Sequence, residues 1–135
     1  PSLIFGKSDN QRFFVNQMID SIHKEQIFEM TKGRQERDFL YVGDLANAIV
    51  RISKSSKLKN VVYNISYGVS ISLYELATRV FNALELKDKL KVGAVNYTDN
   101  ERYYYKISSK RFKDEFEHFP EIKIYNWIIN YVRKK

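Results

Sequence analysis

Residues 33–49 decide the fold, and they read Gly33-Arg34-Gln35-Glu36-Arg37-Asp38-Phe39-Leu40-Tyr41-Val42-Gly43-Asp44-Leu45-Ala46-Asn47-Ala48-Ile49. Within this stretch, the apolar and aromatic run at 39–42 predicts a strand. Gly43-Asp44 then opens a helix that continues to Ser53. The apolar residues that we expect on the inner face of this helix are Leu45, Ala46, Ile49 and Ile52. A strand that leads directly into a helix is therefore the centre of the predicted fold.

Further strands and helices are predicted on both sides of this stretch. Short apolar or β-branched runs indicate strands at 2–5, 27–30, 61–65 and 90–92. Apolar residues at helical spacing indicate helices at 11–23 and 73–84, and the second begins with the capping box Ser72-Leu73-Tyr74-Glu75. A brief helix follows Ser108 or Ser109, and a final helix follows Pro120. We therefore predict an α/β fold, a small mixed α/β domain.

The composition limits the classes of function. The chain has 135 residues, enough for one domain with a real core, and a net charge of +7 with 15% aromatic residues. This balance suits either a nucleic-acid-binding domain or a site for a phosphorylated small molecule. Many of the basic residues fall in predicted turns or at the end of the chain, where solubility explains them, so nucleic acid is the minor alternative. No apolar run is long enough to cross a membrane, and the absence of cysteine fits a cytoplasmic chain.

A search for catalytic machinery gives a negative result. The five glycines are scattered, so the chain has no glycine-rich dinucleotide loop. His23 and His118 stand alone, whereas a metal site needs several converging ligands. Tyr131 and Lys135 match a Tyr-x-x-x-Lys spelling, but Tyr131 lies on the apolar face of the last predicted helix, and we interpret the match as chance. We therefore predict no catalytic, cofactor-binding or metal-binding residue in this chain.

Arg37 is the main candidate for ligand binding. Its planar guanidinium can form a fork of two hydrogen bonds to a phosphate, which suits bidentate recognition better than a lysine would. The alternative is a structural ion pair between Arg37 and Asp38 or Asp44. The residue types alone leave both interpretations open.

The sequence resembles the extended short-chain dehydrogenase/reductases, the nucleotide-sugar epimerases and dehydratases. The segment from Gly33 to Ile49 is similar to the family pattern Gly-x-Gln-x-Arg-Asp-Phe-(Ile/Leu)-Tyr-Val-x-Asp-(Leu/Val)-Ala-x-Ala. Three further segments match in the same order: Ser2–Gly6, Val62–Ala77 and Asp99–Tyr103 with the Ser108-Ser109-Lys110 that follows. The resemblance covers nearly the whole chain.

The resemblance implies a set of substrate-binding residues. Arg37 and Arg102 match the arginines that contact the diphosphate and ribose of the nucleotide sugar. Gln35 and Tyr41 lie nearby in the sequence and are expected as supporting or ribose contacts. Met30 stands where the family often has an aromatic residue that packs on the base.

Three positions depart from the family pattern. Leu3 replaces an asparagine that contacts the sugar, and an apolar side chain cannot form that hydrogen bond. Ser66 replaces a common glycine, and Lys32 replaces a common aspartate or glycine. These departures predict an altered sugar pocket or an unusual ligand.

The resemblance also implies a larger protein. We expect residues 1–135 to be the carboxyl-terminal, nucleotide-sugar-binding domain of an NAD-dependent epimerase or dehydratase, with residues 1–10 as the end of the sheet of a preceding Rossmann domain. That domain would bind NAD(P) and perform the chemistry, so no cofactor is expected on this chain itself. The expected partners are a nucleoside-diphosphate sugar and the Rossmann domain, without a membrane and with a homodimer left open. The alternatives are a stand-alone, inactive nucleotide-sugar-binding or regulatory module and a basic nucleic-acid-binding domain.

Overall fold

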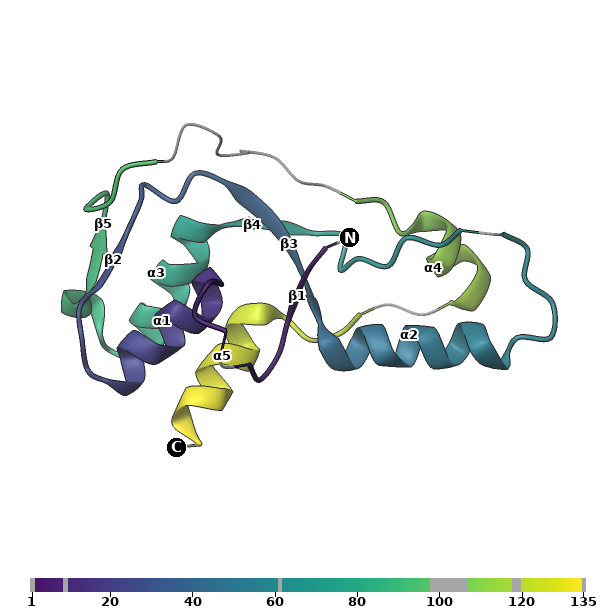
Figure 1. The fold of residues 1–135 in the computed structure, drawn as a ribbon, viewed down its shortest axis with the longest axis horizontal. Coiled ribbons are helices and arrows are strands. Elements are labelled where there is room, and N and C mark those ends of the chain that lie inside the picture. Colours follow the sequence, from purple (N-terminus) through teal and green to yellow (C-terminus); the bar gives the residue numbers. More distant parts are fainter. Residues whose placement is uncertain (1, 9, 61, 98–106, 118–119, 135) are drawn as a thin grey trace.

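The computed structural model describes residues 2–8, 10–60, 62–97, 107–117 and 120–134. Within these residues the chain forms a mixed α/β fold with two small sheets (Figure 1). The strands are β1 (Leu3–Phe5), β2 (Phe28–Met30), β3 (Glu36–Tyr41), β4 (Ser70–Ser72) and β5 (Leu90–Val92). The helices are α1 (Phe14–His23), α2 (Val42–Lys54), α3 (Leu73–Ala83), α4 (Lys110–Phe116) and α5 (Ile124–Arg133), with a 3₁₀ turn at Lys87–Lys89. The predicted fold class is confirmed.

The first sheet has β3 at its centre. β1 pairs with β3 in parallel, with Leu3 opposite Phe39 and Phe5 opposite Tyr41. β4 pairs with the other side of β3 in the antiparallel direction, with Ile71 opposite Arg37. The second sheet is the parallel pair of β2 and β5. The strand predicted within residues 33–49 is thus β3, the strand that pairs with both β1 and β4.

The main core lies where α1, α3 and α5 meet, at one end of the molecule (Figure 1). Phe28 of β2 stacks on Phe81 of α3 with ring centroids 6.0 Å apart. Met18, Leu76 and Ile128 are completely buried around this pair. Each large apolar side chain buried in this way contributes roughly 1.5–3 kcal/mol, so the helical end supplies most of the hydrophobic stabilisation.

The predicted inner face of α2 is wrong for Ala46 and Ile49, whereas Leu45 and Ile52 are half-buried. Ala46 and Ile49 are exposed, as are Val42 and Val50, while the buried residues of α2 are Asp44 and Ala48. The helix lies away from the end formed by α1, α3 and α5 (Figure 1). Its apolar pattern indicates a buried face, but the part of the chain described here does not cover Ile49 or Val50.

The strand predicted at 61–65 is also wrong. In the described residues 62–69 the backbone forms no strand, because side chains hold it instead. The Tyr63 hydroxyl donates to Glu115 at 2.6 Å, and the Tyr63 ring packs on Phe112 and Phe116 of α4. A neighbouring strand begins only at Ser70.

The helix-start signal at Ser72 is confirmed. The Ser72 hydroxyl oxygen accepts a hydrogen bond from the Glu75 amide at 3.0 Å. The Glu75 carboxylate does not complete a reciprocal box but pairs with Arg79 at 2.6 Å. The cap fixes the point at which β4 turns into α3.

Asp38 is a buried polar residue that connects the strand β3 to the segment 62–69. It lies on β3, is fully buried, and accepts hydrogen bonds from the amides of Tyr67 (3.1 Å) and Gly68 (2.8 Å). These contacts attach the irregular segment 62–69 to the central strand. A buried carboxylate is tolerated here because both oxygens have amide donors.

Replacing Asp38 with alanine should destabilise the fold. The change leaves two amides without their acceptor, and we expect a loss of about 2–4 kcal/mol in the free energy of unfolding. Asp38→Asn keeps one acceptor oxygen and should lose less. Urea denaturation followed by circular dichroism measures both, with Asp20→Ala on the partly exposed side of α1 as the control. Equal stability of wild type and Asp38→Ala would contradict the anchoring role.

Glu115 provides a pH-dependent attachment. Desolvation raises the pKa of its carboxyl, but hydrogen bonds from the Tyr63 hydroxyl, the Lys59 amide and Asn60 outweigh that effect and leave the pKa below its ordinary value. A lowered folded-state pKa stabilises the fold above the ordinary carboxyl range, and the contribution is lost as the pH falls through the folded-state pKa.

We therefore expect Glu115→Gln to lower the melting temperature at neutral pH and to have a smaller effect in acid. Thermal denaturation between neutral pH and the acid range measures the difference. The exposed Glu121→Gln is the matched control and should show no such trend. A Glu115→Gln effect that stays constant across this range would contradict the assignment.

Candidate functional site

A large cavity with a mainly apolar wall lies beside the first sheet. Its volume is about 700 Å³, within the usual range for a small-molecule site. It is lined by residues of β1, β3 and the start of α1: Ser2, Leu3, Ile4, Phe5, Gly6, Ser8, Phe13, Phe14, Val15, Asn16, Arg37, Phe39 and Leu73. Among these described residues Arg37 carries the one charge. The cavity thus combines a single cation with apolar surroundings.

Strand geometry explains why Arg37 and Asp38 act separately. Successive side chains of a strand point to opposite faces, so Arg37 shares a face with Phe39 and not with Asp38. The Arg37 side chain is half-buried and donates to the Glu36 carbonyl at 2.9 Å. The Asp38 oxygens accept from the amides of Tyr67 and Gly68, and Asp44 accepts from the Ile122 amide at 3.3 Å. Both carboxylates therefore have backbone partners.

Few other polar groups border the cavity. The Ser2 hydroxyl is buried and has no hydrogen-bond partner among the described residues. The side-chain amide of Asn16 donates to the Asn10 carbonyl at 2.8 Å, and the Ser8 hydroxyl accepts from the Asn10 amide at 3.3 Å. Asn16 and Ser8 thus hold the turn before α1.

The other predicted site residues lie at varying distances from this cavity. Gln35 is buried, its carbonyl accepts from the Leu73 amide at 3.1 Å, and its Oε1 has no partner within the described part of the chain. Tyr41 packs between Phe5 and Trp127. Met30 is buried in the core on β2, and neither it nor Tyr41 or Gln35 lines the cavity. Arg102 lies outside the described residues.

Two aromatic side chains of the cavity lie at the start of α1, in the region from Phe5 to Phe14 that the resemblance implies on the sugar side of the site. Phe13 is 53% exposed at the residue before α1, and Phe14 packs on Phe28 with ring centroids 5.4 Å apart. Phe14 was assigned to the helical stripe, whereas Phe13 falls outside the helical period. The sequence signal for Phe13 is that it is apolar, stands directly before α1, and does not share the helical spacing of the buried residues.

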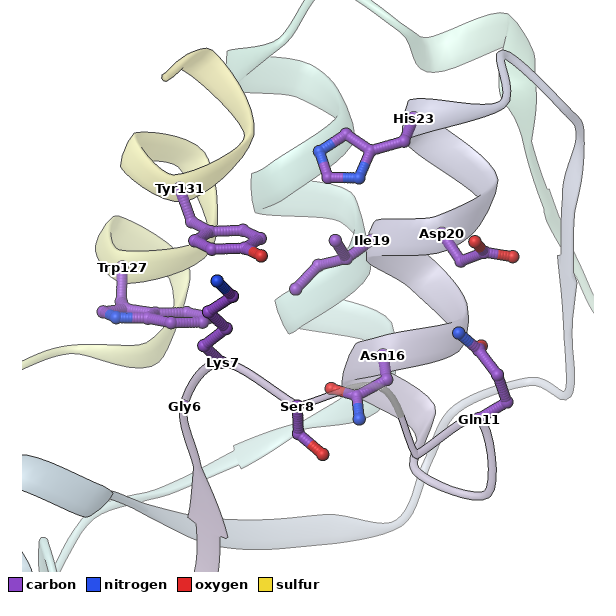
Figure 2. A pocket seen from close by; sticks show the side chains of 10 residues that line it. All are labelled: Gly6, Lys7, Ser8, Gln11, Asn16, Ile19, Asp20, His23, Trp127 and Tyr131. Carbon is purple, nitrogen blue, oxygen red and sulfur yellow. The ribbon is translucent and has the colours of Figure 1, made fainter. Parts of the chain in front are cut away.

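A second cavity lies between α1 and α5 and has a volume of about 110 Å³. Figure 2 shows Lys7 from the loop after β1 pointing toward the stacked rings of Trp127 and Tyr131, with His23 and Asp20 on α1. The rings of Trp127 and Tyr131 lie 5.0 Å apart and nearly parallel. This space is too small for a nucleotide sugar, since such sites need roughly 300 Å³ or more.

The glycines of the chain do not form a cradle for dinucleotide phosphates. Gly33 has φ +64° and packs so tightly that a Cβ would lie 2.6 Å from the Tyr74 nitrogen. Gly68 has φ +88° and lies beside the Lys113 amine. These glycines close turns against the chain itself. No group of three potential metal ligands occurs within the residues that the structure describes, and no helix among them could span a bilayer.

Comparison with known proteins shows which proteins this chain is similar to. The family model described as NAD dependent epimerase/dehydratase family matches residues 1–66. CDP-abequose synthase of Salmonella typhimurium (strain LT2) is 27% identical over 115 residues, which are 82% of this chain and 38% of that protein. CDP-abequose synthase of Salmonella muenchen is 25% identical over 99 residues, 73% of this chain and 34% of that protein.

Solved structures show the same fold. A dTDP-glucose 4,6-dehydratase from Bacillus anthracis in complex with NAD has a TM-score of 0.81 at 20% identity, over 98% of this chain and 42% of that chain. A UDP-glucuronic acid 4-epimerase from Bacillus cereus, in complex with UDP-glucuronic acid and NAD, has a TM-score of 0.82 at 13% identity, over 98% of this chain and 43% of its own.

The fold is therefore that of the Rossmann-type extended short-chain dehydrogenase/reductases. The resemblance inferred from the motifs is confirmed, since the model of the NAD-dependent epimerases and dehydratases matches residues 1–66 and the similar proteins are nucleotide-sugar epimerases, dehydratases and CDP-abequose synthases. The chain spans about two fifths of the length of the proteins that it matches.

Gly33 should be essential for the position of β3 against α3. Gly33→Ala adds a Cβ that meets backbone atoms of Tyr74 in a left-handed conformation, so we expect a loss of about 2–4 kcal/mol in stability. Gly93 also has positive φ, but the nearest atom to its Cβ is 3.8 Å away. Gly93→Ala is thus the matched control, with a cost of about 1 kcal/mol. Thermal denaturation of both variants checks the difference; equal losses would contradict the packing argument.

Proposed function

We propose that this chain holds the diphosphate of a nucleoside-diphosphate hexose within a larger NAD-dependent epimerase or dehydratase. Arg37 binds the diphosphate from β3, and Arg102 is the second expected arginine, from outside the described residues. The single observation that carries the proposal is that Arg37 is the one charged side chain among the described residues that line a cavity of about 700 Å³. A nucleotide sugar combines a charged diphosphate with less polar rings and suits such a lining.

The energetics of the guanidinium support this assignment. A charge-assisted hydrogen bond from arginine to phosphate contributes roughly 1.5–3 kcal/mol, and a planar fork can make two of them. Arg37 is half-buried, so water screens its interactions less than on an open surface. The Glu36 carbonyl at 2.9 Å orients the group before the ligand arrives.

We propose that the rest of the enzyme covers β1 and α2. β1 lies at one side of the order β1-β3-β4, so its outer edge can extend the sheet of a Rossmann domain. Ile4 of β1 and the α2 residues Val42, Ile49 and Val50 expose apolar surface that such a domain would bury. The chain then contributes binding and orientation of the substrate, while NAD(P) and the catalytic residues belong to the covering domain.

Replacing Arg37 with alanine in the intact protein should weaken nucleoside-diphosphate binding about 10- to 100-fold, because the charge-assisted bonds are lost. Arg37→Lys keeps the charge without the fork and should lie between the two. Isothermal titration calorimetry with CDP, dTDP, UDP and GDP measures the affinities. The matched control is Arg34→Ala, because Arg34 is exposed and does not line this cavity.

Two results would contradict the proposal. One is an unchanged affinity for every nucleoside diphosphate in Arg37→Ala, with the variant still folded. The other is tight, strongly salt-dependent binding of DNA or RNA without binding of any nucleoside diphosphate, which would favour a nucleic-acid-binding domain.

A further inference from the structure

A cavity of about 350 Å³ lies where β4, α3 and α5 meet, and the proposed function does not use it. Its volume is within the usual range for a small-molecule site. It is lined by residues of the segment 67–71, by Glu75 and Arg79 of α3, and by residues 123–125 at the start of α5. It shares Phe39, and no other lining residue, with the cavity that contains Arg37.

Apolar side chains form a large part of the cavity wall. Phe39 and Ile124 are almost completely buried, Ile71 is half-buried, and Val69 is 64% exposed. An apolar group placed against Val69 and Ile71 removes exposed apolar surface from water, which favours binding. The rings of Tyr67 and Tyr125 line the same cavity, and aromatic pairs are favoured beyond the area that they bury. The wall therefore suits a ligand with an aromatic ring.

The charged residues of the lining leave one positive charge without a partner. Arg79 lies 2.6 Å from the Glu75 carboxylate, and its guanidinium carbon lies 4.9 Å from the centroid of the Tyr125 ring, so this cation is already paired between α3 and α5. Lys123 also lines the cavity, is exposed, and has no ion pair or hydrogen bond from its amine within the described part of the chain. The uncompensated charge of Lys123 suits a ligand with a single negative charge.

Hydroxyl groups add hydrogen-bond donors to the same wall. The side chains of Tyr67, Ser70 and Tyr125 line the cavity, and none of their hydroxyls has a hydrogen-bond partner among the described residues. A carboxylate accepts several hydrogen bonds, so it can use a lysine amine and hydroxyl donors together. A diphosphate carries more negative charge than the one lysine compensates, so the cavity favours a monoanion.

We propose that this cavity binds a small organic acid, a carboxylate monoanion with one aromatic ring. The carboxylate contacts the Lys123 amine, and the ring packs on Val69 and Ile71. The inference does not rest on the proposed function, because neither Arg37 nor a nucleotide takes part in this contact.

The test compares three matched probes on the intact protein by ligand-observed nuclear magnetic resonance titration. Phenylacetate supplies the ring and the charge, phenylacetamide supplies the ring alone, and acetate supplies the charge alone. We expect a Kd of roughly 1 mM for phenylacetate, a value typical of a ligand of this size. Phenylacetamide should bind about 3- to 10-fold more weakly, since water screens an ion pair with the exposed Lys123. Acetate should bind at least about 10-fold more weakly, because it lacks the ring.

Lys123→Gln should weaken phenylacetate binding about 3- to 10-fold and remove the preference over phenylacetamide. Val69→Asp places a negative charge at the cavity wall and should weaken phenylacetate binding at least as much. Lys134→Gln is the matched control, because Lys134 is an exposed lysine at the other end of α5 and does not line this cavity. Lys134→Gln and Arg37→Ala should both retain the wild-type affinity for phenylacetate.

Three results would overturn the inference: no detectable binding of phenylacetate, equal binding of phenylacetate and phenylacetamide, or an affinity unchanged by Lys123→Gln. Binding that is lost in Arg37→Ala and kept in Lys123→Gln places the probe in the other cavity and also overturns it. Nucleoside-diphosphate binding is measured separately on the same variants, so this inference and the proposed function can each fail alone. Circular dichroism of Lys123→Gln and Val69→Asp confirms that both variants are folded.

Discussion

The buried carboxylate of Asp38 is the interaction on which the rest of the structure depends. It accepts the amides of Tyr67 and Gly68, and so it attaches a segment without regular structure to the central strand β3. Side chains alternate along a strand, so the face of β3 that carries Asp38 is opposite to the face that carries Arg37. Arg37 must then point to the opposite face, toward the cavity. The hydrogen-bonded carboxylate of Asp38 thus determines the direction of Arg37, the one cation among the described residues that line the candidate site.

Short sequence patterns predicted the helices and strands that depend on interactions between residues close together in the sequence. The Ser72 cap, the stripe of α3 and the strand β2 follow from neighbouring residues, and the structure confirms them. The segment at 62–65 is β-branched, yet it forms no strand, since the Tyr63 hydroxyl and ring are held by α4 residues far along the chain. No short-range pattern contains that information, because the partner Glu115 is separated by more than fifty residues.

The candidate site, like the fold, could be predicted only where neighbouring residues carry the information. The residue types in the stretch 33–49 indicated Arg37 as the phosphate ligand but left a structural ion pair as an equal alternative. Strand alternation separates Arg37 from Asp38, and the amide partners of Asp38 give that carboxylate its own role. Phe13 could not be inferred in this way, since its place at the cavity depends on how the turn before α1 meets β1. Burial of Gln35 and Met30 likewise depends on packing and not on spacing.

The apolar pattern of α2 and the apolar wall at Leu3 have the same physical basis but different consequences. An exposed apolar side chain lowers its free energy by any contact that removes water, whether the contact is protein or ligand. α2 exposes Val42, Ile49 and Val50, which a protein layer can cover. Leu3 lies in a concave wall that contains a guanidinium on the same sheet face, and a protein layer that filled it would bury Arg37. A guanidinium covered by an apolar layer loses its contact with water, which costs more than the apolar contact contributes, so the concave wall is better suited to a ligand that brings its own negative charge.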